Sequence, residues 1–176
     1  MTTPDSQSAT TLIACFITAA STLSGVALTN WFNARSLRLN LAEQARQKLA
    51  DRRLAKLEEL YVLFEKWEIN FAQVYLAHLR CYTGKLSFAQ VLELTKSSDM
   101  LLPGEHQKMM MLLNVHFPEL LAKHAVVEAA RGEIAVFLRD PAETQLKSSE
   151  FVARQEEFET ECRIFKAHLA ESARPT

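Results

Sequence analysis

The chain has 176 residues, 48% of them hydrophobic and 23% charged, and a formal net charge of −1 at pH 7. Its three cysteines give neither a CxxC spacing nor the framework of a disulfide-stapled secreted scaffold, and neither an internal repeat nor a low-complexity segment is visible. Four glycines and five prolines fit a helical protein with few loops. The near-zero net charge hides a split into segments of opposite sign.

The first predicted element is a transmembrane helix at residues 10–33, after a short extracytoplasmic tail at 1–9. It lies within a run of 29 residues without a charged side chain, Ser6 to Ala34, and about 20 helical residues suffice to cross a bilayer. A cleavable signal peptide needs basic residues before its apolar stretch, and none is present there. A buried core helix would be shorter and would show a polar stripe.

The residues that end this run predict its orientation. Arg35 and Arg38 follow it directly, and basic residues next to a transmembrane end stay on the cytoplasmic side. Trp31 lies one turn earlier, where an aromatic interfacial anchor is expected. We therefore expect a single-pass protein of the cell membrane, with the N-terminus outside and the C-terminal part in the cytoplasm.

Residues 34–56 are predicted to form a basic juxtamembrane stalk helix. This segment contains seven basic and two acidic residues, whereas residues 57–176 contain 13 basic and 18 acidic residues. The stalk can bind anionic lipid if it lies along the membrane, or an acidic partner or neighbouring subunit if it projects. The acidity of the rest disfavours nucleic acid. Besides the two arginines named above, the basic residues are Arg46, Lys48, Arg52, Arg53 and Lys56.

A helical bundle is predicted over residues 57–172, and its first helix shows large side chains at alternating steps of three and four. No Pro or Gly interrupts the chain from Val26 to Thr83, so the span, the stalk and this helix can form one rod, which Gly84 is expected to end. The core face of this helix consists of Leu57, Leu60, Phe64, Trp67, Phe71, Val74 and His78.

Three further helical segments follow. A capping box at Ser87 to Gln90 starts a short second helix, which ends before a loop at 97–104. The third segment, Glu105 to Arg139, contains Pro118, which predicts a kink or break around residues 115–117. Its core face is predicted to be Leu113, Phe117, Leu120, His124, Val127, Ile134 and Leu138.

The fourth helix is predicted to begin at Asp140-Pro141-Ala142-Glu143, which offers an N-cap and a proline at the first helical position. Residues 173–176 are expected to fray. The fold class is therefore all-α: one N-terminal transmembrane helix that continues through a basic helical stalk into an antiparallel helical bundle. The core face of the fourth helix is predicted to be Phe151, Phe158, Cys162, Phe165 and Leu169.

We predict neither a catalytic site nor a metal or other cofactor. His116, Glu119, His124 and Glu128 lie close in sequence, and His124 and Glu128 share a helix face, but zinc or a di-iron pair would need further ligands. The run of three methionines at 109–111 could line a binding groove, although core filling is the favoured interpretation. Cys81 and Cys162 are expected to be core or boundary residues, without a matched histidine base for nucleophilic chemistry.

Small residues within the predicted span suggest self-association. Ser21, Gly25 and Thr29 are spaced four apart, so they lie on one helix face and would let two helices approach closely in lipid. This spacing predicts a homo-oligomer, which the face from Leu57 to Val74 could extend as a coiled coil.

The favoured function is that of a membrane-anchored protein whose cytosolic bundle is a protein-interaction or sensing module. Its expected partners are the lipid bilayer, further copies of the chain and an unidentified cytosolic or membrane protein. One alternative is a membrane-perturbing effector that acts through self-association of its transmembrane helix. A lesser alternative is a helical-bundle metalloenzyme.

Overall fold

The computed structural model describes residues 4–96 and 102–174, with the side chains of residues 4–14, 17–20 and 27 left undescribed. The described residues form α-helices and short 3-10 helices, without a strand among them, so the all-α prediction is confirmed. The chain divides into two units, Met1–Asp51 and Arg52–Thr176. Helix α1, Pro4–Tyr82, runs through both.

In the first unit, α1 contains the predicted transmembrane helix. Among the residues with described side chains, no helix is both long enough and apolar enough to cross a membrane. The described part of the predicted span includes Ser21, Thr22, Ser24 and Asn30, whose polar groups lower its hydropathy. Residues 10–14, 17–20 and 27 of that span lie outside the described side chains.

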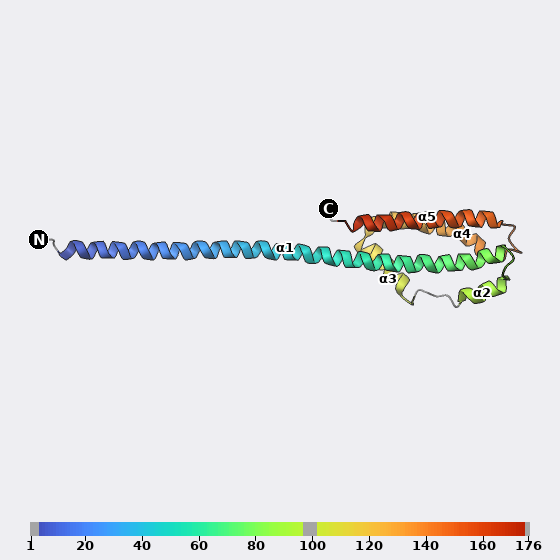
Figure 1. Ribbon diagram of the computed structural model, residues 1–176, viewed down its shortest axis with the longest axis horizontal. Coiled ribbons are helices and arrows are strands. Elements are labelled where there is room, and N and C mark those ends of the chain that lie inside the picture. Colours follow the sequence, from blue (N-terminus) through green and yellow to red (C-terminus); the bar gives the residue numbers. More distant parts are fainter. Residues whose placement is uncertain (1–3, 97–101, 175–176) are drawn as a thin grey trace. The chain divides into compact units, whose positions relative to one another are not determined.

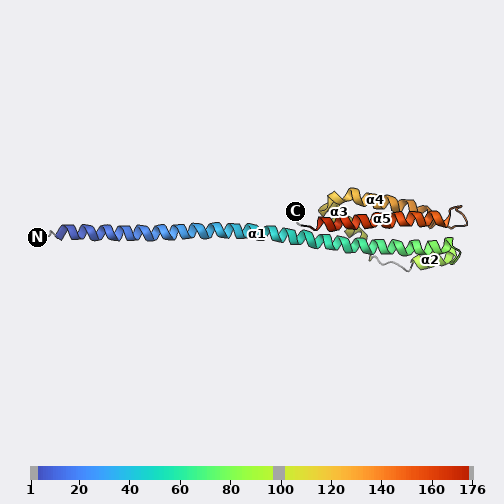
Figure 2. The ribbon, with the colours of Figure 1, turned by 45° about the horizontal axis from the view of Figure 1, so that its top comes forward.

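The second unit is a bundle in which the C-terminal half of α1 packs with the later helices. Two views show α5 beside this half of α1 and antiparallel to it, with α2 next to the end of α1 (Figures 1 and 2). Helix α4 packs against α5. The later elements are α2 (Phe88–Lys96), α3 (Glu105–His116), η1 (Pro118–Leu120), α4 (Leu121–Ile134), η2 (Ala135–Leu138) and α5 (Ser148–Ser172).

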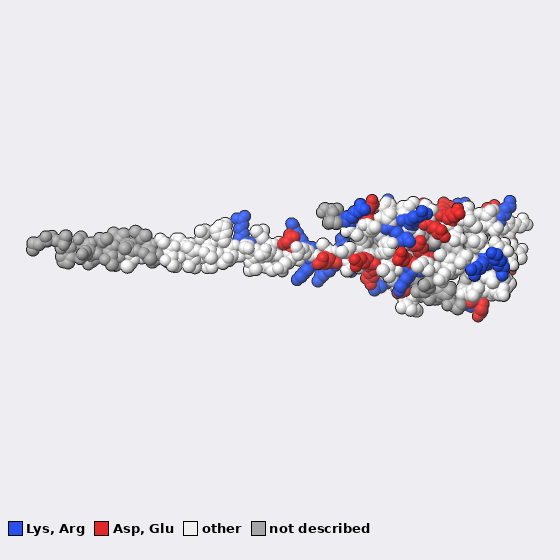
Figure 3. Space-filling view, in the orientation of Figure 1, with Lys and Arg blue, Asp and Glu red and all other residues white. Residues whose placement is uncertain are grey.

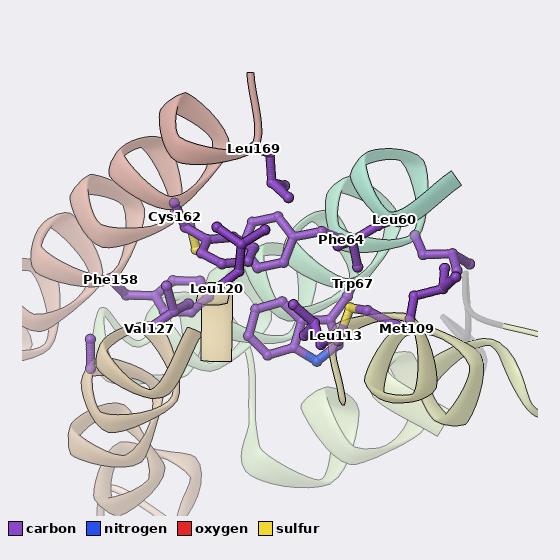
Figure 4. Packing of buried hydrophobic residues seen from close by; sticks show 14 of the residues in the cluster. Leu60, Phe64, Trp67, Met109, Leu113, Leu120, Val127, Phe158, Cys162 and Leu169 are labelled. Carbon is purple, nitrogen blue, oxygen red and sulfur yellow. The ribbon is translucent and has the colours of Figure 1, made fainter. Parts of the chain in front are cut away.

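The bundle core is formed by large apolar side chains from α1, α3, η1, α4 and α5 (Figure 4). The rings of Phe64 on α1 and Phe165 on α5 lie 4.6 Å apart between centroids. Ion pairs link the same helices. Lys66 Nζ on α1 lies 2.6 Å from Glu105 Oε1 on α3. Lys166 Nζ on α5 lies 2.7 Å from Glu68 Oε2 on α1. These contacts lie entirely within the second unit.

The core face of α1 differs from the predicted one at two positions. Tyr75 is buried in place of Val74, and Phe71 is only half-buried. The predicted pattern repeats every 3.5 residues, whereas a straight α-helix has 3.6 residues per turn and drifts by about 20° per heptad. Between Leu57 and Tyr75, about two and a half heptads, this drift brings the next position into the core.

The predicted end of α1 and start of α2 are both confirmed. Gly84 has a φ of 72°, in the left-handed region that glycine adopts without strain, and the Lys85 N–H donates to the Arg80 carbonyl at 2.8 Å. At α2, the Ser87 N–H donates to Gln90 Oε1 at 2.9 Å and the Gln90 N–H donates to Ser87 Oγ at 3.3 Å. These reciprocal bonds form the predicted capping box.

Pro118 breaks the third segment as predicted. Helix α3 ends at His116, and Phe117 leaves the helical region with φ −137° and ψ 53°. Its N–H still donates to the Leu112 carbonyl at 3.2 Å, while its ring is fully buried. Proline cannot donate the backbone bond that would continue α3, so the chain passes through η1 into α4.

The predicted start of the last helix at Asp140 is wrong, because α5 begins at Ser148. Asp140 Oδ1 accepts from the Ala142 N–H at 2.9 Å, and its carbonyl accepts from the N–H groups of Glu143 and Thr144. This closes a single turn. Thr144 Oγ1 also lies 3.0 Å from the hydroxyl of Tyr82 on α1, which ties the turn to the bundle. The core residues predicted for this helix are nevertheless all buried.

Candidate functional site

The first unit carries an exposed apolar surface on α1, which we call the N-terminal apolar surface. Leu23, for example, is 70% exposed. Figure 3 shows the described surface of this part of α1 without charged atoms until the first arginines. Exposed apolar surfaces of this kind are common where proteins contact lipid or other proteins. Its described large side chains are Phe16, Leu23, Val26, Leu28, Trp31 and Phe32.

The residues predicted to mediate self-association lie on this part of α1. Ser21, Gly25 and Thr29 are all exposed, and a Cβ built at Gly25 would meet no atom within 4 Å. Thr29 Oγ1 donates to the Gly25 carbonyl at 2.9 Å. The space beside Gly25 is therefore open, and the Thr29 hydroxyl is satisfied by the backbone of its own helix.

Trp31 and Arg35, predicted as anchor and topology residues, are in contact. The guanidinium carbon of Arg35 lies 5.6 Å from the centroid of the Trp31 ring, within the range of a cation–π interaction. Trp31 also meets Phe32 edge-to-face, with centroids 5.0 Å apart. Arg38 is exposed one turn further on. The aromatic and basic residues thus form one amphipathic group at the end of the uncharged run.

The predicted basic residues divide into two sets. Arg46, Lys48 and Arg52 are exposed on α1. Arg53 and Lys56 instead contact the bundle within the second unit, as described next. Sequence spacing along α1 could not separate the two sets, because the partners of Arg53 and Lys56 are side chains of η1 and α3.

Arg53 and Lys56 contact residues 116–119, where α3 ends and η1 begins. Arg53 Nη2 donates to Glu119 Oε1 at 2.7 Å, and its guanidinium carbon lies 5.2 Å from the centroid of the Phe117 ring. Lys56 Nζ lies 2.7 Å from His116 Nε2. The break at Pro118 positions all three partners.

The histidines and glutamates considered as metal ligands are not brought together. His116 and Glu119 pair with basic residues of α1. His124 Nε2 and Glu128 Oε1 are 3.9 Å apart on α4. In the part of the chain that the structure describes, no group of three or more His, Cys, Asp or Glu residues could hold a metal ion.

The predicted core or boundary places of Cys81 and Cys162 agree with the structure, whereas core filling by the methionine run holds for Met109 but not for Met111. Cys162 is buried and Cys81 half-buried, and burial raises the pKa of both thiols above its ordinary value. They therefore stay protonated at neutral pH and are poor nucleophiles. Met109 fills the core, Met111 is exposed and Met110 lies against the core from the edge of a cavity.

This cavity, which we call the His124 cavity, is not predicted by the sequence analysis. It has a volume of about 360 Å³ and lies between α1, α3 and α4. The sequence predicts Trp67 and Phe71 on the core face of one helix and His124 on that of another. The signal in the sequence that could have marked the cavity is the set of polar residues at 124, 128 and 131 on one face of α4. Its lining consists of Trp67, Asn70, Phe71, His106, Met110, His124, Glu128 and Arg131.

Comparisons of the chain with protein-family models, with curated proteins and with solved structures found no match.

Proposed function

We propose that this chain is a single-pass membrane-anchored protein whose cytosolic helical bundle is a protein-interaction or sensing module, and that it works as a homo-oligomer. One observation carries the proposal: a single helix, α1, joins a charge-free run with exposed apolar side chains to a bundle that has its own core. The first part suits an anchor and the second a folded module.

The N-terminal apolar surface supports the anchor. Exposed apolar area costs about 25 cal/mol per Å² in water, so a long apolar surface is stable only when something covers it. Lipid demands that polar groups be satisfied internally, and Thr29 meets this demand through its bond to Gly25. The contact between Trp31 and Arg35 fits an interfacial position, where an aromatic ring and a basic group lie side by side.

The strip of small residues Ser21, Gly25 and Thr29 supports self-association. Helices associate in lipid through close backbone packing, which small residues permit. No large side chain of the strip stands in the way, and a Cβ at Gly25 would meet open space. A second helix could therefore approach α1 along this strip.

Membrane fractionation of the full chain tests the anchor. We expect the protein to remain in the membrane fraction after washes with high salt and with alkaline carbonate. Leu23→Arg places a charge in the middle of the predicted span at a cost of about 2.5–3.5 kcal/mol, and should move much of the protein to the soluble fraction. Leu39→Arg is the matched control beyond the basic boundary and should leave the distribution unchanged. Recovery of the unmodified protein in the wash would refute the anchor.

Light scattering of the detergent-solubilised chain tests the oligomer. We expect a mass above that of one chain, which Gly25→Leu should reduce because a large side chain separates the helices. Ala34→Leu, outside the strip, is the control. A monomer for the unmodified protein would contradict the proposal.

A potential-sensitive dye in cells that express the chain distinguishes the anchor from the effector. A passive anchor leaves the membrane potential unchanged. If the membrane potential is lost, and this loss depends on Ser21 and Gly25, the function is that of a membrane-perturbing effector and not that of a docking module.

A further inference from the structure

The His124 cavity has the size and the walls of a small-molecule site. Its volume of about 360 Å³ falls within the range of roughly 300–1,000 Å³ typical of ligand pockets. Trp67 and Phe71 of α1 form an aromatic wall, with ring centroids 4.9 Å apart, and Met110 of α3 contributes a flexible apolar side chain. Such walls suit a flat aromatic ring.

One residue that lines this cavity has a buried polar atom without a partner. His124 is only 3% exposed, and its Nε2 has no hydrogen-bond partner among the described residues. Burial lowers the pKa of the imidazole, with a smaller opposing effect from Glu128, so the ring is neutral at pH 7. A neutral imidazole nitrogen that is buried without a partner carries a desolvation penalty that a ligand hydrogen bond would relieve.

Glu128 and Arg131 complete the polar side of the cavity. Arg131 Nε donates to Glu128 Oε2 at 2.7 Å, and the guanidinium carbon lies 5.1 Å from the centroid of the Phe71 ring. The other carboxylate oxygen, Oε1, is 3.9 Å from His124 Nε2, too far for a direct hydrogen bond. One oxygen atom placed between them could bond to both.

We propose that the His124 cavity binds a small uncharged aromatic molecule that carries one hydroxyl group. The ring lies against Trp67 and Phe71, and the hydroxyl donates its proton to Glu128 Oε1 while its oxygen accepts from the N–H at His124 Nε2. The ligand is uncharged because Glu128 and Arg131 already neutralise each other. The inference gives the sensing role proposed above a ligand class, but the cavity belongs to the bundle alone and does not depend on the anchor.

Phenol is the probe, and the methyl group of Met110 is the reporter. The full chain, labelled with ¹³C at its methionine methyl groups, is titrated in detergent. We expect the Met110 resonance to shift and saturate at millimolar phenol, while Met109 in the core and exposed Met111 move little. Toluene, which lacks the hydroxyl, should bind at least about five-fold more weakly, since one buried hydrogen bond is lost.

Two histidine variants separate the site from the fold. His124→Phe should keep the Met109 resonance of the folded core and weaken phenol binding at least about five-fold. His78→Phe is the matched control, because His78 is also buried with an unpartnered nitrogen, Nδ1, but does not line the cavity. It should bind phenol like the unmodified chain. All samples share the same detergent, so partition of phenol into micelles is common to them.

Glu128→Gln is the second variant if His124→Phe does not fold, and it should also weaken phenol binding. Equal affinity for phenol and toluene would overturn the proposal, as would unchanged phenol binding by a folded His124 variant. An unshifted Met110 resonance up to the solubility of phenol would likewise overturn it. None of these results bears on membrane fractionation, so failure of the ligand site and failure of the anchor are distinguishable.

Discussion

His78 and His124 are the two buried polar side chains among the described residues of the core, and each has a ring nitrogen without a hydrogen-bond partner. Burial lowers the pKa of both below the ordinary value of 6.5. For His124, Glu128 acts in the opposite direction, whereas His106 and Arg131 add to the lowering. The folded state therefore holds both rings neutral at pH values where the unfolded chain would protonate them.

We predict that the protein loses stability as the pH falls below about 6.5. The unfolded chain binds more protons than the folded chain between the ordinary and the lowered pKa, so stability is full above this window and decreases through it. Urea unfolding at about pH 7.5 and about pH 5.5 measures the difference. The doubly substituted chain, with His78→Phe and His124→Phe, should lose most of it. An equal pH dependence in both proteins would assign the effect to other groups.

The contact between Arg53 and Glu119 has a small expected energy despite its 2.7 Å distance. Both side chains are about half exposed, so solvent screens the pair and a coupling of about 0.2–1 kcal/mol is expected. A double-mutant cycle with Arg53→Ala and Glu119→Ala, measured by urea unfolding, gives this coupling. It should shrink at high salt. A coupling of zero at low salt would mean that the pair does not form in solution.

At the scale of elements, two glycines predict opposite effects of the same substitution. Gly84 has a positive φ of 72°, and Gly84→Ala should destabilise the protein by about 1 kcal/mol because an L side chain is strained there. Gly132 lies within α4, and an added Cβ would meet nothing within 4 Å. Gly132→Ala should stabilise it by about 0.5–1 kcal/mol. Thermal unfolding checks both, and a stabilising Gly84→Ala would contradict the described turn.

Helix signals in the sequence were reliable where one local interaction decides the structure. Gly84, the capping box at Ser87 and the break at Pro118 act within a few residues, and each prediction is confirmed. The helix start predicted at Asp140 is wrong because a distant contact acts there in addition to the local one. The Asp140 side chain caps one turn as expected, but the contact of Thr144 with Tyr82 on α1 holds the chain in that turn. Sequence spacing contains no information about a contact 62 residues away.

The candidate sites were predictable to different degrees. The uncharged run, Trp31 and the basic boundary could be read directly, because their chemistry lies on one helix. The His124 cavity could not, because Trp67, Met110 and His124 come from α1, α3 and α4. His124 was expected on the core face, and it is there, but its missing partner and its neighbours become visible only when the helices are packed.

For the whole molecule, we predict that residues 52–176 fold without the first unit. The core cluster begins at Leu57 and lies entirely within Arg52–Thr176, so removal of residues 1–51 deletes none of its residues. Circular dichroism should show a helical fragment with a cooperative thermal transition. A fragment that starts at Leu57 lacks Arg53 and Lys56 and should be slightly less stable. An unfolded longer fragment would show that the bundle depends on the first unit.

The packing of α5 on α1 has a consequence for the order in which the bundle forms. Phe64 and Phe165 meet at 4.6 Å although about 100 residues separate them, and closing so long a loop costs more entropy than closing a short one. Helices α4 and α5 follow each other closely in the chain and pack against each other. We expect these local contacts to form early in refolding and the α1–α5 seam to close last. Substitutions at Phe165 should then mainly accelerate unfolding and leave the refolding rate nearly unchanged.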